Sequence, residues 1–163
     1  MSTIKIQGTE LTYNPADVIT FDEGLIGLPN LRRMVLVGQS DISPFLWLAS
    51  LDDETAFLVL EPTSVFPEYH PVISDDAKTC INLGDDAPPT LLTIVSLSPD
   101  WKKSTVNLRA PLFINASEMR GAQAVLMTSN YKLSEPLPHG WDSPDAVDSN
   151  LTEQQVMPKL SAR

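Results

Sequence analysis

The sequence predicts a mainly β protein, a small antiparallel β-barrel-like domain with one short helix. Three observations lead to this prediction. Apolar and polar residues alternate over short runs, which is typical of strands that bury one face. Fourteen prolines against seven glycines interrupt the 163 residues at intervals too short for many long helices. Turn residues recur at near-regular spacing between the runs, as in antiparallel barrels and sandwiches.

The first strands are expected at residues 3–7, 9–13, 18–21 and 34–37. The first two runs alternate around Gly8, which is a hairpin signature. The third and fourth are separated by a loop that contains Gly24, Gly27 and Pro29. Its two glycines lack the Lys-Ser pair and the third glycine of a phosphate-binding loop, so we expect a backbone turn with positive φ.

Two central strands are expected at residues 45–50 and 55–60. Both are apolar at consecutive positions, which indicates burial on both faces. The acidic residues Asp52, Asp53 and Glu54 separate them as a turn. We therefore expect a central hairpin that is covered on both sides.

One segment has the signals of a helix. Ser74 can cap its start, and Asp75 and Asp76 suit the positive end of the helix dipole. Gly84 can close it. The expected helix is short, about two and a half turns.

The remaining strands are expected at residues 90–97, 105–110, 112–117 and 123–127. The second of these places Val106, Leu108 and Ala110 on one face, and the last two form a hairpin turned by residues 118–121. Beyond residue 138 the composition becomes polar, with few apolar residues. We expect the barrel domain over residues 1–138 and a flexible acidic and polar tail over 139–163.

Composition and charge exclude several classes of function. The net charge is −10, which repels phosphate backbones and favours a basic partner over nucleic acid. No apolar run approaches the roughly 18 residues of a membrane span. With one cysteine and no signal-peptide pattern at residues 1–5, we expect a reducing cytoplasm.

The residues that enzymes need are sparse. His70 and His139 lack a second ligand at metal-binding spacing, and Cys80 is expected to be a small buried thiol. We expect no catalytic residue, metal or cofactor. The acidic turns leave one alternative open, a small carboxylate-based hydrolase or metal-binding enzyme. A carbohydrate-binding module would instead need Trp47 or Trp101 as an exposed platform.

Three segments carry a resemblance to a known family. They read FDEGLIGL at residues 21–28, PFLWLASLDD at 44–53 and VNLRAPLFIN at 106–115. In this order, from about residue 3 to 138, the sequence resembles the FliW family of flagellar assembly factors. Further family-like positions are Phe57, Pro62, Pro67, Tyr69, residues 120–123 and Tyr131.

The resemblance implies a fold and a function. It implies a small antiparallel barrel-like domain that is not an enzyme and acts in the cytoplasm by partner switching. Such a protein binds newly made flagellin and, when free of it, binds the translational regulator CsrA. Binding would relieve the repression of flagellin messenger RNA by CsrA, a small basic RNA-binding dimer.

We expect the partner contacts among a defined set of residues. Acidic turns would meet the basic CsrA, and an apolar groove would hold a helix of flagellin. Two open alternatives are that the aromatic residues of this set pack in the core, and that its Asn and Arg residues cap turns or pair with acids. The set is Asp22, Glu23, Phe45, Trp47, Asp52, Asp53, Glu54, Asn107, Arg109 and Asn115.

Overall fold

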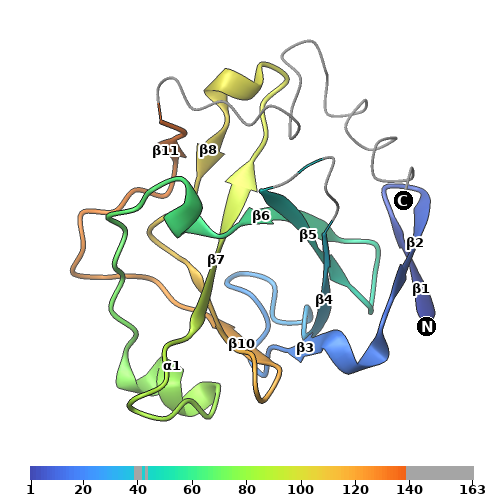
Figure 1. Ribbon diagram of the computed structural model, residues 1–163, viewed down its shortest axis with the longest axis horizontal. Coiled ribbons are helices and arrows are strands. Elements are labelled where there is room, and N and C mark those ends of the chain that lie inside the picture. Colours follow the sequence, from blue (N-terminus) through green and yellow to red (C-terminus); the bar gives the residue numbers. More distant parts are fainter. Residues whose placement is uncertain (39–41, 43, 139–163) are drawn as a thin grey trace.

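The computed structural model describes residues 1–38, 42 and 44–138. These residues form eleven strands, one α-helix and short 3-10 turns (Figure 1). The expected tail at 139–163 lies outside the described residues. The strands are β1 (Ser2–Ile6), β2 (Thr9–Tyr13), β3 (Val18–Thr20), β4 (Arg33–Gly38), β5 (Phe45–Ser50), β6 (Ala56–Leu60), β7 (Thr90–Ser96), β8 (Thr105–Val106), β9 (Leu112–Asn115), β10 (Arg120–Gln123) and β11 (Glu135–Pro136). The helix is α1 (Asp75–Cys80), and the 3-10 turns are η1 (Pro15–Asp17), η3 (Pro62–Ser64) and η4 (Trp101–Lys103).

Seven strands close a barrel, which confirms the predicted fold class. Strands β3 to β7 follow one another antiparallel, and β9 pairs with both β7 and β10. The ring closes where β10 lies beside β3, with Arg120 opposite Thr20. This last pair is parallel, unlike its neighbours, because six successive antiparallel pairs in a ring of seven strands leave β3 and β10 running in the same direction. Strands β8 and β11 extend the sheet from the other half of β7.

The barrel interior is filled by side chains from every second position of the strands. Met34, Leu48, Val59, Leu92 and Leu112 are buried there, and each comes from a different strand. Because side chains alternate across a strand, the residues between them point outward. The interior is therefore a packed core without a channel.

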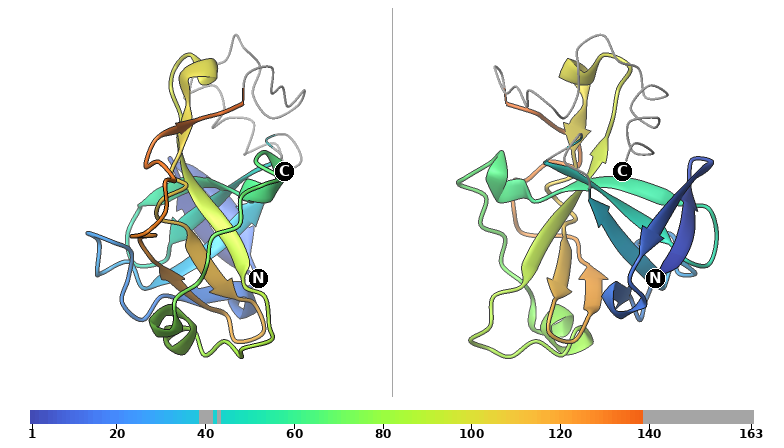
Figure 2. Two further views of the ribbon diagram at one scale, coloured as in Figure 1. Left: turned by 90° about the vertical axis from the view of Figure 1, so that its left-hand side faces the viewer. Right: turned by 45° about the vertical axis from the view of Figure 1, so that its right-hand side comes forward.

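A second apolar layer lies on the outer face of β4, β5 and β6. Val35, Trp47 and Leu58 face it, and the hairpin of β1 and β2 covers it with Ile6 and Leu11. Figure 2 shows this hairpin lying beside the barrel. Burial on both faces explains why these strands are apolar throughout, and it confirms the predicted central hairpin.

The expected strand at 105–110 is shorter in the structure. Only Thr105–Val106 forms a ladder, as β8. Beyond it the Asn107 side chain accepts a hydrogen bond from the Ala110 N–H (3.0 Å). Such a local side-chain bond competes with strand pairing. The predicted faces nonetheless hold, since Val106 and Leu108 are buried with Ala110.

The expected hairpin of 112–117 and 123–127 exists, but its second strand begins earlier. Strand β10 starts at Arg120, so the turn lies at residues 116–119. Gly121 was expected in the turn and is instead a strand residue that packs inward. A Cβ there would lie 2.6 Å from the Phe21 ring. The glycine serves close packing, and turn geometry does not require it.

The structure confirms the predicted start of the helix, but the helix ends before the predicted position. The Ser74 hydroxyl accepts a hydrogen bond from the Ala77 N–H (3.1 Å). The helix stops at Cys80, and Asn82, rather than Gly84, adopts the left-handed conformation (φ 55°). No helix in the described ranges is long and apolar enough to cross a membrane.

Candidate functional site

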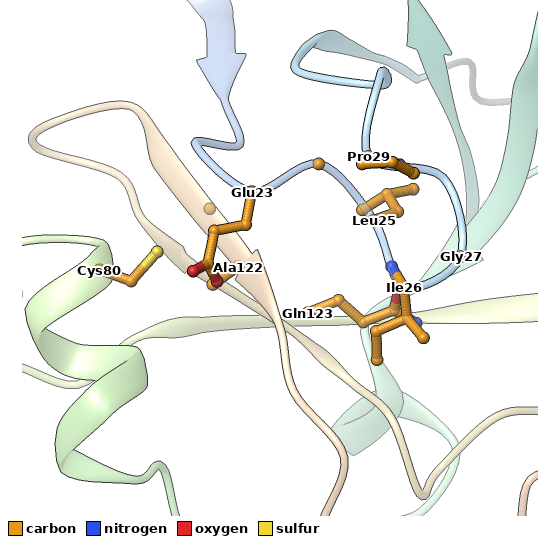
Figure 3. Close-up of a pocket in the computed structure, with 10 residues that line it drawn as sticks. Glu23, Leu25, Ile26, Gly27, Pro29, Cys80, Ala122 and Gln123 are labelled. Carbon is orange, nitrogen blue, oxygen red and sulfur yellow. Dashed lines mark hydrogen bonds between the residues drawn. The ribbon is translucent and has the colours of Figure 1, made fainter.

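A pocket of about 320 Å³ opens where the loop after β3 passes β10 and the end of α1. Figure 3 shows its walls, with Glu23 and Cys80 on one side and Ile26 and Gln123 on the other. Its lining comes from three separate stretches of the chain, which the barrel closure brings together. The lining residues are Glu23, Gly24, Leu25, Ile26, Gly27, Pro29, Cys80, Gly121, Ala122 and Gln123.

The loop over residues 21–29 is held in one shape by its glycines and its own hydrogen bonds. Gly24 has φ +68° and donates its N–H to the Phe21 carbonyl (3.0 Å). Leu25 and Leu28 then exchange backbone hydrogen bonds of 3.1 and 2.8 Å across a tight turn. Gly27 in that turn also has positive φ, as expected for both glycines. The first family-like segment is thus a rigid loop.

Two side chains of β10 fasten this loop to the barrel. The Ile26 N–H donates to Gln123 Oε1 (2.9 Å), and Gln123 Nε2 donates to the Ala110 carbonyl (3.1 Å). Arg120 forms an ion pair with Asp22 (3.2 Å). Residues 21–28 and 120–123, both family-like in sequence, therefore build one site.

The charge inside the pocket comes from Glu23. Its carboxylate points across the pocket toward Ala122, beside the Cys80 thiol (Figure 3). Over the described ranges it has no hydrogen-bond or ion-pair partner. Burial, and then the nearby charges of Glu23 and Asp22, raise the pKa of Cys80. The thiol therefore stays protonated at neutral pH and is a poor nucleophile.

The second acidic turn lies at the same edge of the sheet. Thr20 at the end of β3 pairs with Arg33 at the start of β4, and Arg33 binds Asp52 (2.6 Å) beyond the end of β5. The structure therefore brings together the turns at 22–23 and 52–54, which the sequence placed far apart. Five expected contact residues share this acidic edge.

The Asp53 carboxylate forms a hydrogen bond within its own turn. Its Oδ1 accepts a hydrogen bond from the Thr55 N–H (2.8 Å), and this bond is the main cause that lowers the pKa of Asp53. The Ser50 hydroxyl accepts from the N–H groups of Asp52 and Asp53. Glu54 is exposed at the tip of the turn.

Phe45 and Trp47, expected either as anchors for a partner or as core residues, are buried. Their exposed fractions are 1% and 5%, and both belong to the outer apolar layer. Their burial supports the core alternative. It also removes Trp47 as the exposed platform that a carbohydrate-binding module would need.

The polar residues of the third family-like segment are mostly engaged in the fold. Asn115 is buried and donates to the carbonyls of Ile81 (2.9 Å) and Asn82 (3.0 Å), which ties the end of α1 to β9. The Asn107 side chain accepts the Ala110 N–H, as described above. Arg109 is partly exposed, and both ion pairs found among the described residues involve other arginines.

The expected alternative of a carboxylate-based enzyme needs acids that share a pocket. Within the described ranges, no group of three or more His, Cys, Asp or Glu side chains could hold a metal ion. Glu23 alone supplies a carboxylate to the pocket above. His70 is exposed, and His139 lies outside the described residues.

Of the ten residues that line the pocket, only Glu23 was among the expected contacts, and Ile26 and Gln123 were missed. Both lie in segments that the family resemblance covers, but their spacing of 97 residues gives no local pattern. No sequence signal separates the exposed Ile26 from Leu25, which lies between the same two glycines and is buried in the core.

Comparisons with known proteins agree with this arrangement. Residues 4–137 match the family model of the FliW protein. The chain is similar to the flagellar assembly factor FliW of Clostridium botulinum (strain Alaska E43 / Type E3), with 39% identity over 134 residues, 82% of this chain and 94% of the relative. It is also similar to flagellar assembly factor FliW 2 of Desulfotalea psychrophila (strain LSv54 / DSM 12343), with 32% identity over 139 residues, 85% of this chain and 91% of the relative.

A crystal structure of the flagellar assembly factor FliW has the same fold. It superposes with a TM-score of 0.77 at 24% identity and covers 86% of this chain and 100% of that chain. The family match spans the whole barrel, including the pocket and the acidic edge. This chain therefore belongs to the FliW family of flagellar assembly factors.

Proposed function

We propose that this flagellar assembly factor acts in the cytoplasm by binding two proteins in turn. It binds newly made flagellin and, when flagellin is exported, the freed protein binds CsrA. Binding to CsrA antagonises its repression of flagellin messenger RNA. The observation that carries this proposal is the match to the FliW family over residues 4–137.

The acidic edge supports a contact with a basic partner. Glu23 and Glu54 are exposed on neighbouring turns, and the whole chain carries a net charge of −10. A field of this sign attracts a basic protein and raises the association rate. Once docked, it also disfavours RNA phosphates near the complex, even where the RNA groove stays open.

Exposed apolar side chains support a contact with a helix of flagellin. Ile26 and Leu28 on the loop are 51% and 43% exposed, and Met127 beyond β10 is 76% exposed. An amphipathic helix binds through its apolar face. Apolar side chains at the surface, beside a preformed pocket, are the feature such a partner needs.

Calorimetric titration against flagellin and against CsrA tests both contacts, and stopped-flow mixing measures the rate of association with CsrA. We expect binding to each, and a slower association with CsrA at raised salt, because screening is effective beyond about 8 Å at physiological ionic strength. Absence of both interactions would refute the proposal. A salt-independent association rate would remove only the electrostatic argument.

A competition experiment tests the switch itself. A preformed complex of this protein with CsrA is challenged with flagellin, in a solution that also contains the RNA target of CsrA. We expect flagellin to release CsrA and restore repression of the messenger RNA. A stable ternary complex with both proteins bound would contradict an exchange between them.

A further inference from the structure

We infer that the pocket beside β10 receives an arginine side chain of the basic partner. In this assignment Glu23 is the counter-ion, and the apolar walls hold the methylene part of the side chain. The inference rests on the proposed binding to CsrA and adds a defined contact to it. Four properties of the pocket support it.

The size of the pocket suits a single side chain. Sites for small molecules and cofactors usually run from about 300 to 1,000 Å³. This pocket, at about 320 Å³, is at the lower end of that range. From β10 its lining includes Ala122, whose side chain is a single methyl group.

The charge of the pocket requires a cation. Arg120 is already paired with Asp22, so among the described residues Glu23 carries the one carboxylate of this site that has no partner. An anionic ligand would be repelled. A metal ion would find too few ligands, because no group of three or more His, Cys, Asp or Glu side chains in the described ranges could hold one and the Gln123 amide is engaged with Ile26 and Ala110.

The apolar walls favour arginine over a small cation. Leu25, Ile26 and Pro29 can pack against a methylene chain while its charged end reaches Glu23. The guanidinium group is weakly hydrated, remains charged when partly buried, and binds a carboxylate through two parallel hydrogen bonds. The ammonium group of lysine is more strongly hydrated than a guanidinium group, and it would contact the carboxylate as a single point charge.

The loop is already in the shape that binding needs. The pairing of Leu25 with Leu28 and the bond from Ile26 to Gln123 fix its backbone before a partner arrives. A preformed site loses little conformational entropy on binding. The exposed rim at Ile26 and Leu28 can then exclude water around the buried ion pair, as the periphery of an interface does around its strongest contacts.

A small-molecule titration tests the pocket without any partner protein. The probes are N-acetyl-arginine amide and its neutral isostere N-acetyl-citrulline amide, followed by amide NMR shifts. We expect the arginine probe to bind at millimolar strength and to shift the amides of residues 24–27 and 121–123 in the wild type. Citrulline, or the arginine probe with Glu23→Gln, should shift them far less. Equal shifts from both probes, or shifts confined to other residues, would overturn the assignment.

Affinity for CsrA tests the same contact in the complex. We expect Glu23→Gln to weaken binding about tenfold, in the range of close interfacial charge pairs. The matched control is Glu10→Gln on β2, which removes the same charge from the hairpin and should change the affinity less than twofold. Equal losses for both variants would overturn the arginine contact. If the wild type ignores CsrA altogether, the proposed function fails, and the probe titration still decides what the pocket binds.

Discussion

The two acidic turns at the edge of the barrel look alike in sequence but differ in which of their carboxylates can still bind a partner protein. Each follows a strand and each gives an aspartate to an arginine, Asp22 to Arg120 and Asp52 to Arg33. In the turn after β5, Asp53 is also occupied, by the Thr55 N–H. In the loop after β3, Glu23 has no hydrogen-bond or ion-pair partner within the described part of the chain, and it faces a pocket. Internal hydrogen bonds, more than the number of acids, decide which charge can meet a partner.

The largest effect is expected from the glycine that shapes the pocket loop. A Cβ at Gly24 would lie 2.6 Å from the Leu28 carbonyl oxygen, at a residue with φ +68°. We expect Gly24→Ala to lower the free energy of unfolding by about 3 kcal/mol, measured by urea denaturation.

Gly8→Ala is the matched control for this prediction. Gly8 has φ +83°, but nothing lies within 4 Å of its Cβ position. Its substitution should cost about 1 kcal/mol, from the positive φ alone. Equal losses at the two positions would show that the close contact at Gly24 is relieved by a shift of the loop.

A smaller effect is expected from the side chain that fastens the same loop. Gln123→Ala leaves the Ile26 N–H and the Ala110 carbonyl without their partners, so we expect a loss of about 1–2 kcal/mol in the free energy of unfolding. Hydrogen exchange at the Ile26 amide should accelerate.

The Gln123→Glu variant tests the two hydrogen bonds of Gln123 separately. The glutamate keeps an acceptor for Ile26 and loses the donor to Ala110, so exchange at Ile26 should stay slow while stability still falls. If exchange at Ile26 is as slow in Gln123→Ala as in the wild type, the loop does not depend on Gln123.

How far the sequence predicts this molecule depends on whether a feature is local. Alternation at residues 9–13 and the turn at Gly8 lie within one short stretch, so the first hairpin was predicted. The parallel pairing of Thr20 with Arg120 joins residues 100 positions apart, and no local pattern reports it. The same holds for the pocket, because Ile26 and Gln123 meet only after that closure.

Local patterns also misled where packing overrode them. Gly121 follows three residues that suit a turn, and it was assigned to the turn. The structure needs a glycine there because the Phe21 ring occupies the space of a Cβ. Glu23 was among the expected contacts because acidic turns attract basic partners, but the sequence did not separate it from Asp53. Only the hydrogen-bond partners make that distinction.

Acid sensitivity gives a test of the turn after β5. The Thr55 bond lowers the pKa of Asp53 below its value of 3.8 in an unfolded chain. The charged form is therefore stabilised by folding, and this contribution is present above pH 3.8 and is lost as the pH falls through the folded value. We expect Asp53→Ala to be less stable than the wild type at neutral pH, with a difference that shrinks in acid.

Asp53→Asn is the control for this pH dependence. Its amide oxygen can still accept the Thr55 N–H, but it does not titrate in this range. The loss of stability between neutral and acidic pH should be shallower in Asp53→Asn than in the wild type. If the free energy of unfolding falls by the same amount between neutral and acidic pH in both proteins, the hydrogen bond does not favour the charged form.

The smallest effect is expected at Cys80, and it compares the two turns directly. Burial and the neighbouring carboxylates of Glu23 and Asp22 raise the pKa of this thiol, so alkylation by iodoacetamide at pH 8 should be slower than that of a free cysteine. Removing one carboxylate lowers the pKa and raises the thiolate fraction. We expect Glu23→Gln to accelerate alkylation, because one of the charges that raise the pKa of Cys80 is then gone.

Glu54→Gln removes the same charge from the other turn and should leave the alkylation rate unchanged. The comparison holds solvent, reagent and net charge constant, so a difference between the two variants measures how close each carboxylate is to the pocket. Equal acceleration by both would mean that the whole acidic edge acts on the thiol through its long-range field. Glu23 would then have no special place in the pocket, and the distinction between the two turns would be lost.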